Sequence, residues 1–158
     1  MRKLAIVISI AATALMVPAA AKAAPPSAVS GTETFTGATA TVVRTAGGNT
    51  IIANTLTGII AGSFTGTFTA DFTTIAHSSG QANDVHGTFI CTCSIAGRSG
   101  SVTFRFEGTG TPSATELHGE TIGATGGLQG LHSNVTVDIV GAAATYSGLE
   151  QQRNGQWR

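Results

Sequence analysis

Charged side chains are scarce in this sequence of 158 residues, of which only 10% are Asp, Glu, Lys or Arg. Lysine occurs only as Lys3 and Lys22, so a chain that begins after residue 23 cannot perform Schiff-base chemistry. Such a chain has five arginines against eight acidic residues, a net charge of about −3. We expect no nucleic-acid partner, because a mildly acidic protein with few cations is a poor match for phosphate backbones.

The sequence also lacks an apolar run of the roughly 20 residues that a membrane-spanning helix needs. Its one long apolar run, residues 4–17, follows two basic residues and precedes Ala21-Lys22-Ala23, a small-x-small site for a signal peptidase. We therefore predict a secretory signal peptide over residues 1–23 and a mature chain that starts at Ala24. The expected location is secreted or periplasmic, as in bacterial export, with no membrane association after the signal is removed.

What the sequence does have is threonine, with 24 in residues 24–158, together with 21 glycines in the whole chain. Threonine favours strands, and glycine marks turns and bulges. Short alternating runs, separated by Gly- and Ser-rich turns, predict eight strands with no helical crossover between them. The expected strands cover residues 32–44, 49–60, 63–75, 85–95, 100–108, 114–122, 134–140 and 143–148.

This pattern predicts an all-β fold in one domain over residues 32–149. An antiparallel eight-stranded barrel is the expected architecture, and a two-sheet sandwich is the alternative. Residues 24–31 are expected to form a flexible leader and residues 150–158 a loose C-terminal tail, because neither segment alternates.

Large apolar residues recur at every second position in two of the expected strands, opposite rows of threonine and charge. We expect these residues to face the interior and, where the interior is hollow, to contact a ligand. The candidate ligand-lining residues are Phe64, Phe68, Phe72, Val102, Phe104 and Phe106.

Three segments carry a resemblance to a known family: FTGTFTADF (64–72), AGRSGSVTFRFEGTGT (96–111) and GATGGLQGLHS (123–133). They resemble a bacterial family of unknown function that is related in fold to allene oxide cyclase and dirigent-type barrels. The resemblance implies an eight-stranded, allene oxide cyclase-like barrel with a Gly-Arg-Ser-Gly turn and a late Gly-Leu-rich loop. No catalytic residue of the characterised cyclases can be placed on this sequence, so the resemblance leaves the activity open.

Cys91 and Cys93 are the only two cysteines, and they lie two positions apart on one expected strand. Regular strand geometry puts their Cα atoms roughly 6.5 to 7 Å apart, at the upper limit for a disulfide. Export favours oxidation of a cysteine pair. Two alternatives therefore stay open: a local disulfide at a bulge, or two free thiols buried beside Phe89.

The densest polar cluster falls on the expected hairpin of strands 100–108 and 114–122. An odd sum of opposed residue numbers, such as 223, sets Phe106 opposite Leu117 and directs the charged residues outward. Arg105 would then face His118. We interpret the cluster as an exposed charge ladder, with a ligand-orienting patch at the barrel mouth as the alternative; its members are Arg105, Glu107, Glu116, His118 and Glu120.

The histidines at positions 77, 86, 118 and 132 match no standard zinc spacing. A hairpin centred on Gly126 would set His132 opposite Glu120, but two such ligands do not make a metal site. We predict neither a metal nor another cofactor.

Two functions fit these observations. The first is an exported β-barrel without enzymatic activity, which binds a small hydrophobic molecule or is purely structural. The alternative is a cofactor-free isomerase or cyclase of the allene oxide cyclase type, in which an apolar lumen shapes the substrate and excludes water. The sequence identifies no catalytic residue and no oligomeric state. A hollow interior is the feature that either binding or isomerisation requires.

Overall fold

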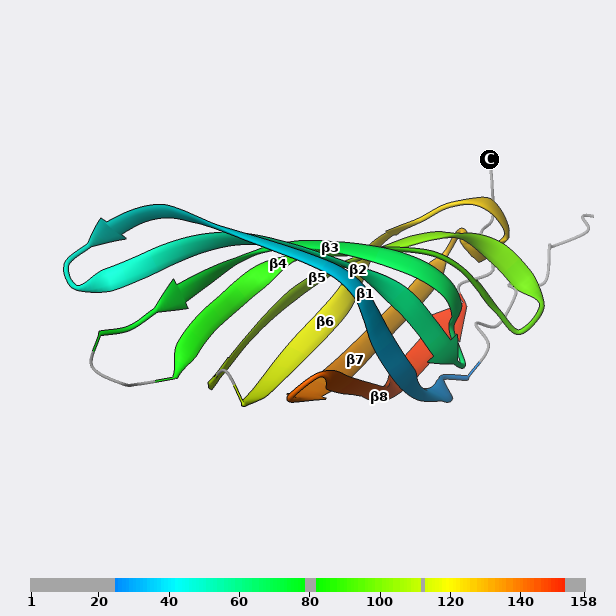
Figure 1. Cartoon of the computed structure of the whole chain (residues 1–158). Coiled ribbons are helices and arrows are strands. Elements are labelled where there is room, and N and C mark those ends of the chain that lie inside the picture. Colours follow the sequence, from blue (N-terminus) through cyan, green and yellow to red (C-terminus); the bar gives the residue numbers. More distant parts are fainter. Residues whose placement is uncertain (1–24, 79–81, 112, 153–158) are drawn as a thin grey trace, which may run out of the picture.

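The computed structural model describes residues 25–78, 82–111 and 113–152. The expected signal peptide and the end of the expected tail lie outside these residues. Eight long strands make up nearly all of the described chain (Figure 1). They are β1 (Ser27–Ala46), β2 (Asn49–Gly62), β3 (Thr65–Ala76), β4 (Asn83–Ile95), β5 (Arg98–Thr111), β6 (Ala114–Ala124), β7 (Leu131–Val140) and β8 (Ala143–Gln152). A 3-10 helix, η1 (Gly126–Leu128), precedes β7.

The eight strands form one antiparallel sheet that closes in a ring, because β1 pairs with both β2 and β8. The number and order of the strands agree with the prediction, and the closed single sheet rules out the two-sheet sandwich. The prediction of a flexible leader was wrong for residues 27–31, which begin β1 and pair with β8. The tail was likewise wrong for residues 150–152, which end β8. Both segments gain backbone hydrogen bonds that alternation alone does not reveal.

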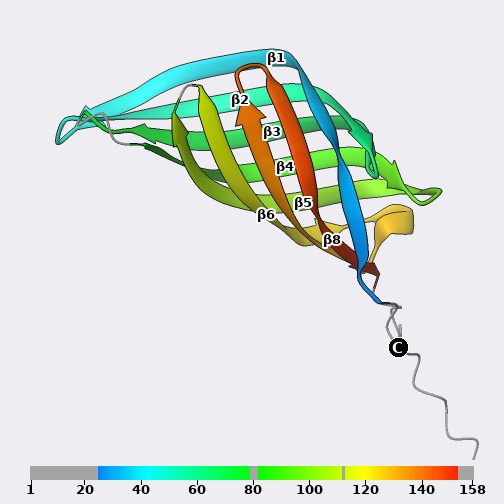
Figure 2. The ribbon, with the colours of Figure 1, turned by 90° about the horizontal axis from the view of Figure 1, so that it is seen from below.

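The ring is complete along only part of β1. Residues 27–34 of β1 pair with β8, whereas residues 31–46 pair with β2, so the second half of β1 has a strand on one side only. In Figures 1 and 2 this half extends beyond the end of β8 together with β2 and with β3, which pairs with β2 along its length. The ring therefore opens where β1 leaves β8, directly after Thr34.

Inward-facing aromatic rings lie against glycines of the neighbouring strands. Phe68 of β3 is opposite Gly58 of β2, where an added Cβ would come within 2.5 Å of the ring. Phe72 is opposite Gly87 of β4, where an added Cβ would meet the Phe72 side chain at 2.4 Å. Glycine at these sites gives the rings room to lie along the inner wall, so large and small residues alternate around the interior.

Apolar packing fills the ring at one end. Leu128 of η1 and Leu131 of β7 are almost fully buried there, in the same cluster as Phe64 and Tyr146. Gly31 allows this packing, since an added Cβ would come within 2.4 Å of the Tyr146 hydroxyl. The short helix between β6 and β7 thus helps to close this end, and open space remains further along the ring.

The β5–β6 hairpin has an odd register, as predicted, but its position differs by two residues. Phe106 is opposite Gly119 and Arg105 is opposite Glu120, instead of Leu117 and His118. The turn determines the position: Thr111 is opposite Ala114, and its hydroxyl accepts hydrogen bonds from the backbone N–H groups of Ser113 and Ala114. The hairpin is therefore centred one residue later than the sequence suggested.

Candidate functional site

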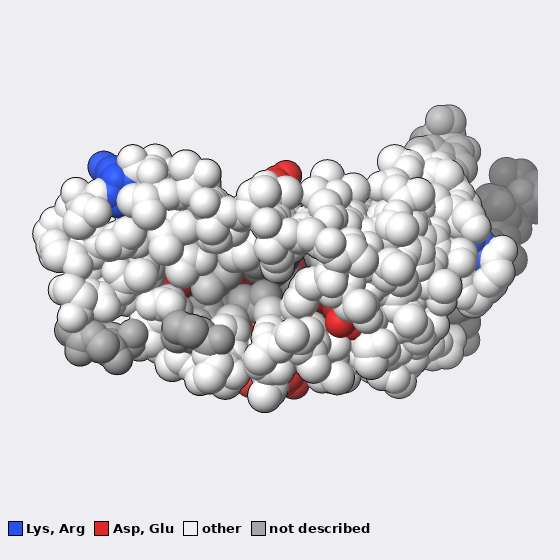
Figure 3. Space-filling model, viewed as in Figure 1, with Lys and Arg blue, Asp and Glu red and all other residues white. Residues whose placement is uncertain are grey.

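The interior of the ring holds a cavity of about 270 Å³ that receives residues from all eight strands. Its wall contains every phenylalanine of the chain and its single tyrosine. The face shown in Figure 3 is hollowed and mostly white, since charged side chains are few. The aromatic members of the wall are Phe35, Phe64, Phe68, Phe72, Phe89, Phe104, Phe106 and Tyr146.

The aromatic rings contact one another around the cavity. Phe68 stacks on Phe89 with ring centroids 4.7 Å apart, and Phe35 meets Phe68 edge to face at 6.3 Å. Phe89 and Phe104 continue the series at 5.9 Å. Such pairs are favourable beyond their buried area, so they hold the apolar wall in a defined shape.

Five of the six predicted lining residues border the cavity: Phe64, Phe68, Phe72, Phe104 and Phe106. Val102 is fully buried within the core cluster and does not border the cavity. The structure thus brings the phenylalanines of β3 and β5 together, as their alternation predicted. Whether they contact a ligand stays a prediction.

Sequence reasoning left most of the wall unnamed, and its most consequential omission is Glu33 of β1. It faces inward on the same row of β1 as Val29 and Phe35, and it is partly buried. The signal was present in the sequence, because Glu33 shares its odd position with these two apolar residues while Thr32 and Thr34 occupy the other face. Among the wall residues that the structure describes, Glu33 is the only Asp or Glu, and none is Arg, Lys or His.

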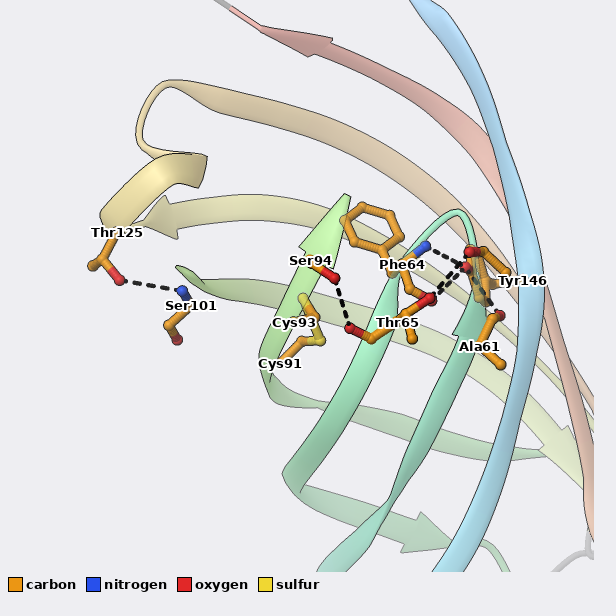
Figure 4. The surroundings of a disulfide bond; sticks show 10 residues. Ala61, Phe64, Thr65, Cys91, Cys93, Ser94, Ser101, Thr125 and Tyr146 are labelled. Atoms are coloured by element: carbon orange, nitrogen blue, oxygen red, sulfur yellow. Dashed lines mark hydrogen bonds between the residues drawn. A yellow bond between two sulfur atoms is a disulfide. The ribbon is translucent and has the colours of Figure 1, made fainter. Parts of the chain in front are cut away.

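Burial raises the pKa of the Glu33 carboxyl from 4.5 to about 7, because the apolar wall disfavours the charged form. Burial also raises the pKa of Tyr146 above its ordinary value, and negative charge on Glu33 raises it further. The Tyr146 hydroxyl is already used by the backbone: it accepts from the Phe64 N–H at 2.9 Å and donates to the Ala61 carbonyl at 3.3 Å (Figure 4). Tyr146 is therefore an anchor of the packed end.

Polar residues border the cavity at the ends of four strands. Thr74 lies near the end of β3, Asn83 starts β4, Thr111 ends β5 and Thr115 lies near the start of β6. These ends lie together because neighbouring strands are antiparallel. The cavity therefore has a polar rim at this end and an apolar wall further in, as small-molecule sites commonly do.

The predicted polar cluster lies outside the ring. Arg105, Glu107, Glu116, His118 and Glu120 are all exposed. Arg105 forms an ion pair with Glu120, and Nε2 of His118 lies 3.1 Å from Oε1 of Glu116. Several of these residues border a second, more polar depression formed by β5 to β8. No residue of the cluster reaches the interior cavity, so it is not a patch at the cavity mouth.

The two cysteines form a disulfide inside the ring. Cys91 and Cys93 are both buried on the inner face of β4, and their Cα atoms are 5.4 Å apart instead of the expected 6.5 to 7 Å (Figure 4). No bulge accompanies it, because β4 pairs continuously with β3 and β5 through these residues. The disulfide shortens the strand locally and lies beside the packed end of the ring.

The histidines do not gather into a site. His86, His118 and His132 are exposed, and His77 contacts Asp84 at 3.0 Å. Asn134, not His132, lies opposite Glu120, because the loop through η1 shifts the β6–β7 register by two residues. Across the part of the chain that the structure describes, no three His, Cys, Asp or Glu side chains come together as a metal ion would require.

Comparison with known proteins supports the fold and assigns no activity. No protein-family model and no curated protein matches the sequence. The fold is similar to the crystal structure of a DUF3224-family protein of unknown function from Shewanella oneidensis MR-1. The TM-score is 0.68 at 16% sequence identity, and the match covers 83% of this chain and 100% of the other. Within residues 25–78, 82–111 and 113–152, no helix is long and apolar enough to cross a membrane.

At this level of identity the similarity concerns the fold alone. It places an all-β ring of this kind in a protein of unknown function, and it does not extend to allene oxide cyclase or dirigent-type proteins. The cyclase resemblance drawn from the sequence stays a prediction.

Proposed function

We propose that this protein binds a small, largely apolar molecule in the interior of the ring. The observation that carries the proposal is the concentration of all seven phenylalanines around one cavity of about 270 Å³. A folded domain of this size gains most from a filled core, because a void forfeits dispersion contacts along its lining. A large apolar space bordered by a polar rim is the usual arrangement of a ligand pocket.

Ligand binding is tested by narrowing the cavity. Ala70 borders the cavity from β3 and is almost fully buried, so Ala70→Leu adds apolar volume to the wall. We expect it to weaken binding of the neutral apolar dye N-phenylnaphthylamine by about tenfold or more, as one excess branched side chain in a tight pocket does. The matched control is Thr69→Leu, the neighbouring outward residue, which should bind the dye as the unaltered protein does.

Circular dichroism of both variants checks that the fold is retained. The proposal is overturned if the unaltered protein does not bind the dye, or if both leucine variants bind equally well. Native mass spectrometry of protein purified from its own host would identify the natural occupant as a mass lost on denaturation.

A second candidate, a cofactor-free isomerase or cyclase, is favoured by one observation. Glu33 places a carboxyl with a pKa of about 7 on the wall of an apolar cavity, and such a group can exchange a proton near neutral pH. Turnover would require conversion of the bound compound, not merely its retention. Incubation of the purified protein with the co-purified compound, followed by chromatography, distinguishes the two candidates.

Export is part of the proposal. Buried disulfides are typical of oxidising compartments, and the Cys91–Cys93 bond fits that setting. The apolar segment 4–17 and the small-x-small site before Ala24 supply the signal. N-terminal sequencing of protein from the culture medium or periplasm should begin at Ala24, and a chain that keeps Met1 would contradict export by this route.

A further inference from the structure

The cavity wall contains very few ionisable side chains. Among the described residues that line the cavity, Glu33 is the only one with a carboxyl side chain, and none is basic. An anionic ligand such as a fatty acid would bring a second negative charge into an apolar space without a cation to balance it, which is costly. The wall therefore disfavours a ligand with a carboxylate head group and is compatible with a neutral or cationic one.

The Glu33 carboxylate also has unused hydrogen-bonding capacity. Among the described residues, none makes a hydrogen bond or an ion pair with its two oxygens. Its cross-strand partners are Ile60 of β2 and Ala144 of β8, neither of which can donate from its side chain. A carboxylate accepts several hydrogen bonds when ionised, so the cavity presents acceptors that the fold does not satisfy.

The position of Glu33 separates a head-group site from a tail site. Glu33 is the penultimate β1 residue that pairs with β8, so it lies where the ring opens. Phe35 follows on the same inward row, and Phe68 and Phe89 continue from it across β3 and β4. Aromatic faces attract cations and also bury apolar chains.

We propose that the ligand is a hydrophobic amine, whose ammonium group pairs with the Glu33 carboxylate at the opening while its apolar part lies among the phenylalanines. This rests on the proposed function, since it requires that the interior be occupied. Three observations carry it: no described residue pairs with the Glu33 carboxylate, no base stands among the described wall residues, and aromatic rings adjoin Glu33. Charge-assisted hydrogen bonds of this kind in apolar surroundings are strong and specific.

The raised pKa of Glu33 gives the pairing a pH dependence. Below about pH 7 the free protein holds a proton on Glu33, which an ammonium group must displace. No titratable group faces Glu33 from β2, and within the described part of the wall Tyr146 of β8 is the only other titratable residue. Amine affinity should therefore fall by up to about tenfold per pH unit below pH 7, whereas alcohol affinity should not fall.

Isothermal titration calorimetry with three probes of one chain length tests the proposal: decylamine, decanol and decanoate. Above pH 7 we expect decylamine to bind about 10- to 100-fold more tightly than decanol, and decanoate to bind most weakly. Glu33→Gln should abolish the preference for the amine while decanol still binds. Glu107→Gln, which removes an exposed carboxylate on the outside of β5, should leave the preference unchanged.

The outcomes separate the two proposals. If no probe binds, the interior is not a ligand site and the proposed function fails with the amine. If decanol binds as tightly as decylamine, or decanoate more tightly, the proposed function stands and the amine proposal is overturned. A preference for decylamine that survives in Glu33→Gln would also overturn it, because the ammonium would then be recognised elsewhere.

Discussion

Replacing Glu33 by glutamine should change the pH dependence of stability in a direction that the structure determines. The carboxyl has a pKa of about 7 in the folded protein, whereas its ordinary pKa in the unfolded chain is 4.5. Below about pH 4.5 both states hold the proton, so the group adds no pH dependence there. As the pH rises from about 4.5 to about 7, the unfolded chain releases the proton first, and the free energy of unfolding falls.

The size of this effect follows from the pKa difference. Each unit corresponds to about 1.4 kcal/mol, so the shift from 4.5 to about 7 amounts to about 3 kcal/mol at most. Water that enters the cavity would reduce the amount, so we take about 1 to 3 kcal/mol as the expected range. Glutamine has a similar shape and no charge. The free energy of unfolding of Glu33→Gln minus that of the unaltered protein should therefore increase by about 1 to 3 kcal/mol as the pH rises from about 4 to about 8.

Equilibrium unfolding in urea, followed by far-ultraviolet circular dichroism at several pH values, measures this difference. The quantity to compare is the free energy of unfolding of Glu33→Gln minus that of the unaltered protein, so contributions from all other groups cancel. Glu107→Gln is the matched control on the outer face and should change stability by under about 0.5 kcal/mol at either end of the range. A flat difference curve for Glu33→Gln would refute the placement of its carboxyl in an apolar cavity.

Three further predictions concern the wall, the packed end and the outer surface. Phe68→Ala should cost about 3 to 5 kcal/mol in urea unfolding, because Phe68 is 4% exposed and contacts two other rings; a loss under about 1 kcal/mol, similar to that of Thr67→Ala, would contradict its inward position. Tyr146→Phe should cost about 1 to 3 kcal/mol, because it leaves the backbone donor of Phe64 unpaired; an unchanged urea midpoint would show that this hydrogen bond contributes nothing. Arg105→Ala should cost under about 1 kcal/mol and leave dye binding unchanged, since its ion pair is solvent-exposed; weaker dye binding would link the outer surface to the cavity.

The sequence predicted the number of strands and part of the aromatic wall because both depend on local patterns. Alternation of phenylalanine with threonine placed Phe64, Phe68 and Phe72 on one face, and the cavity borders that face. Strand positions in the hairpins were less accurate. The β5–β6 register depends on which hydrogen bonds Thr111 forms within the turn, and turn composition does not specify them.

Other features could not be derived from composition at all. Strand β1 is longer than its alternating segment, since residues 27–31 are strand only because β8 is available to pair with them. The Cys91–Cys93 disulfide depends on a Cα separation of 5.4 Å that regular strand geometry does not give. Glu33 is different, because Phe35 two positions later lies in the expected strand and indicates that Glu33 faces inward. A charged residue in a row of apolar residues indicates a functional site in a sequence, as a buried polar group does in a structure.

Burial of the Glu33 carboxylate lowers the stability of the fold, so we infer that Glu33 serves ligand binding and not folding. Small proteins unfold with only about 5 to 15 kcal/mol, so a penalty of about 1 to 3 kcal/mol at neutral pH is a substantial part of the total. Within the described residues Glu33 makes no hydrogen bond that would offset this penalty, and its partners Ile60 and Ala144 would pack equally well against an apolar residue. A bound cation would remove the penalty, because an opposite charge nearby stabilises the ionised carboxylate that desolvation destabilises. A bound amine should therefore raise the free energy of unfolding by more than a neutral ligand with the same apolar tail does. This difference between the two ligands should vanish in Glu33→Gln.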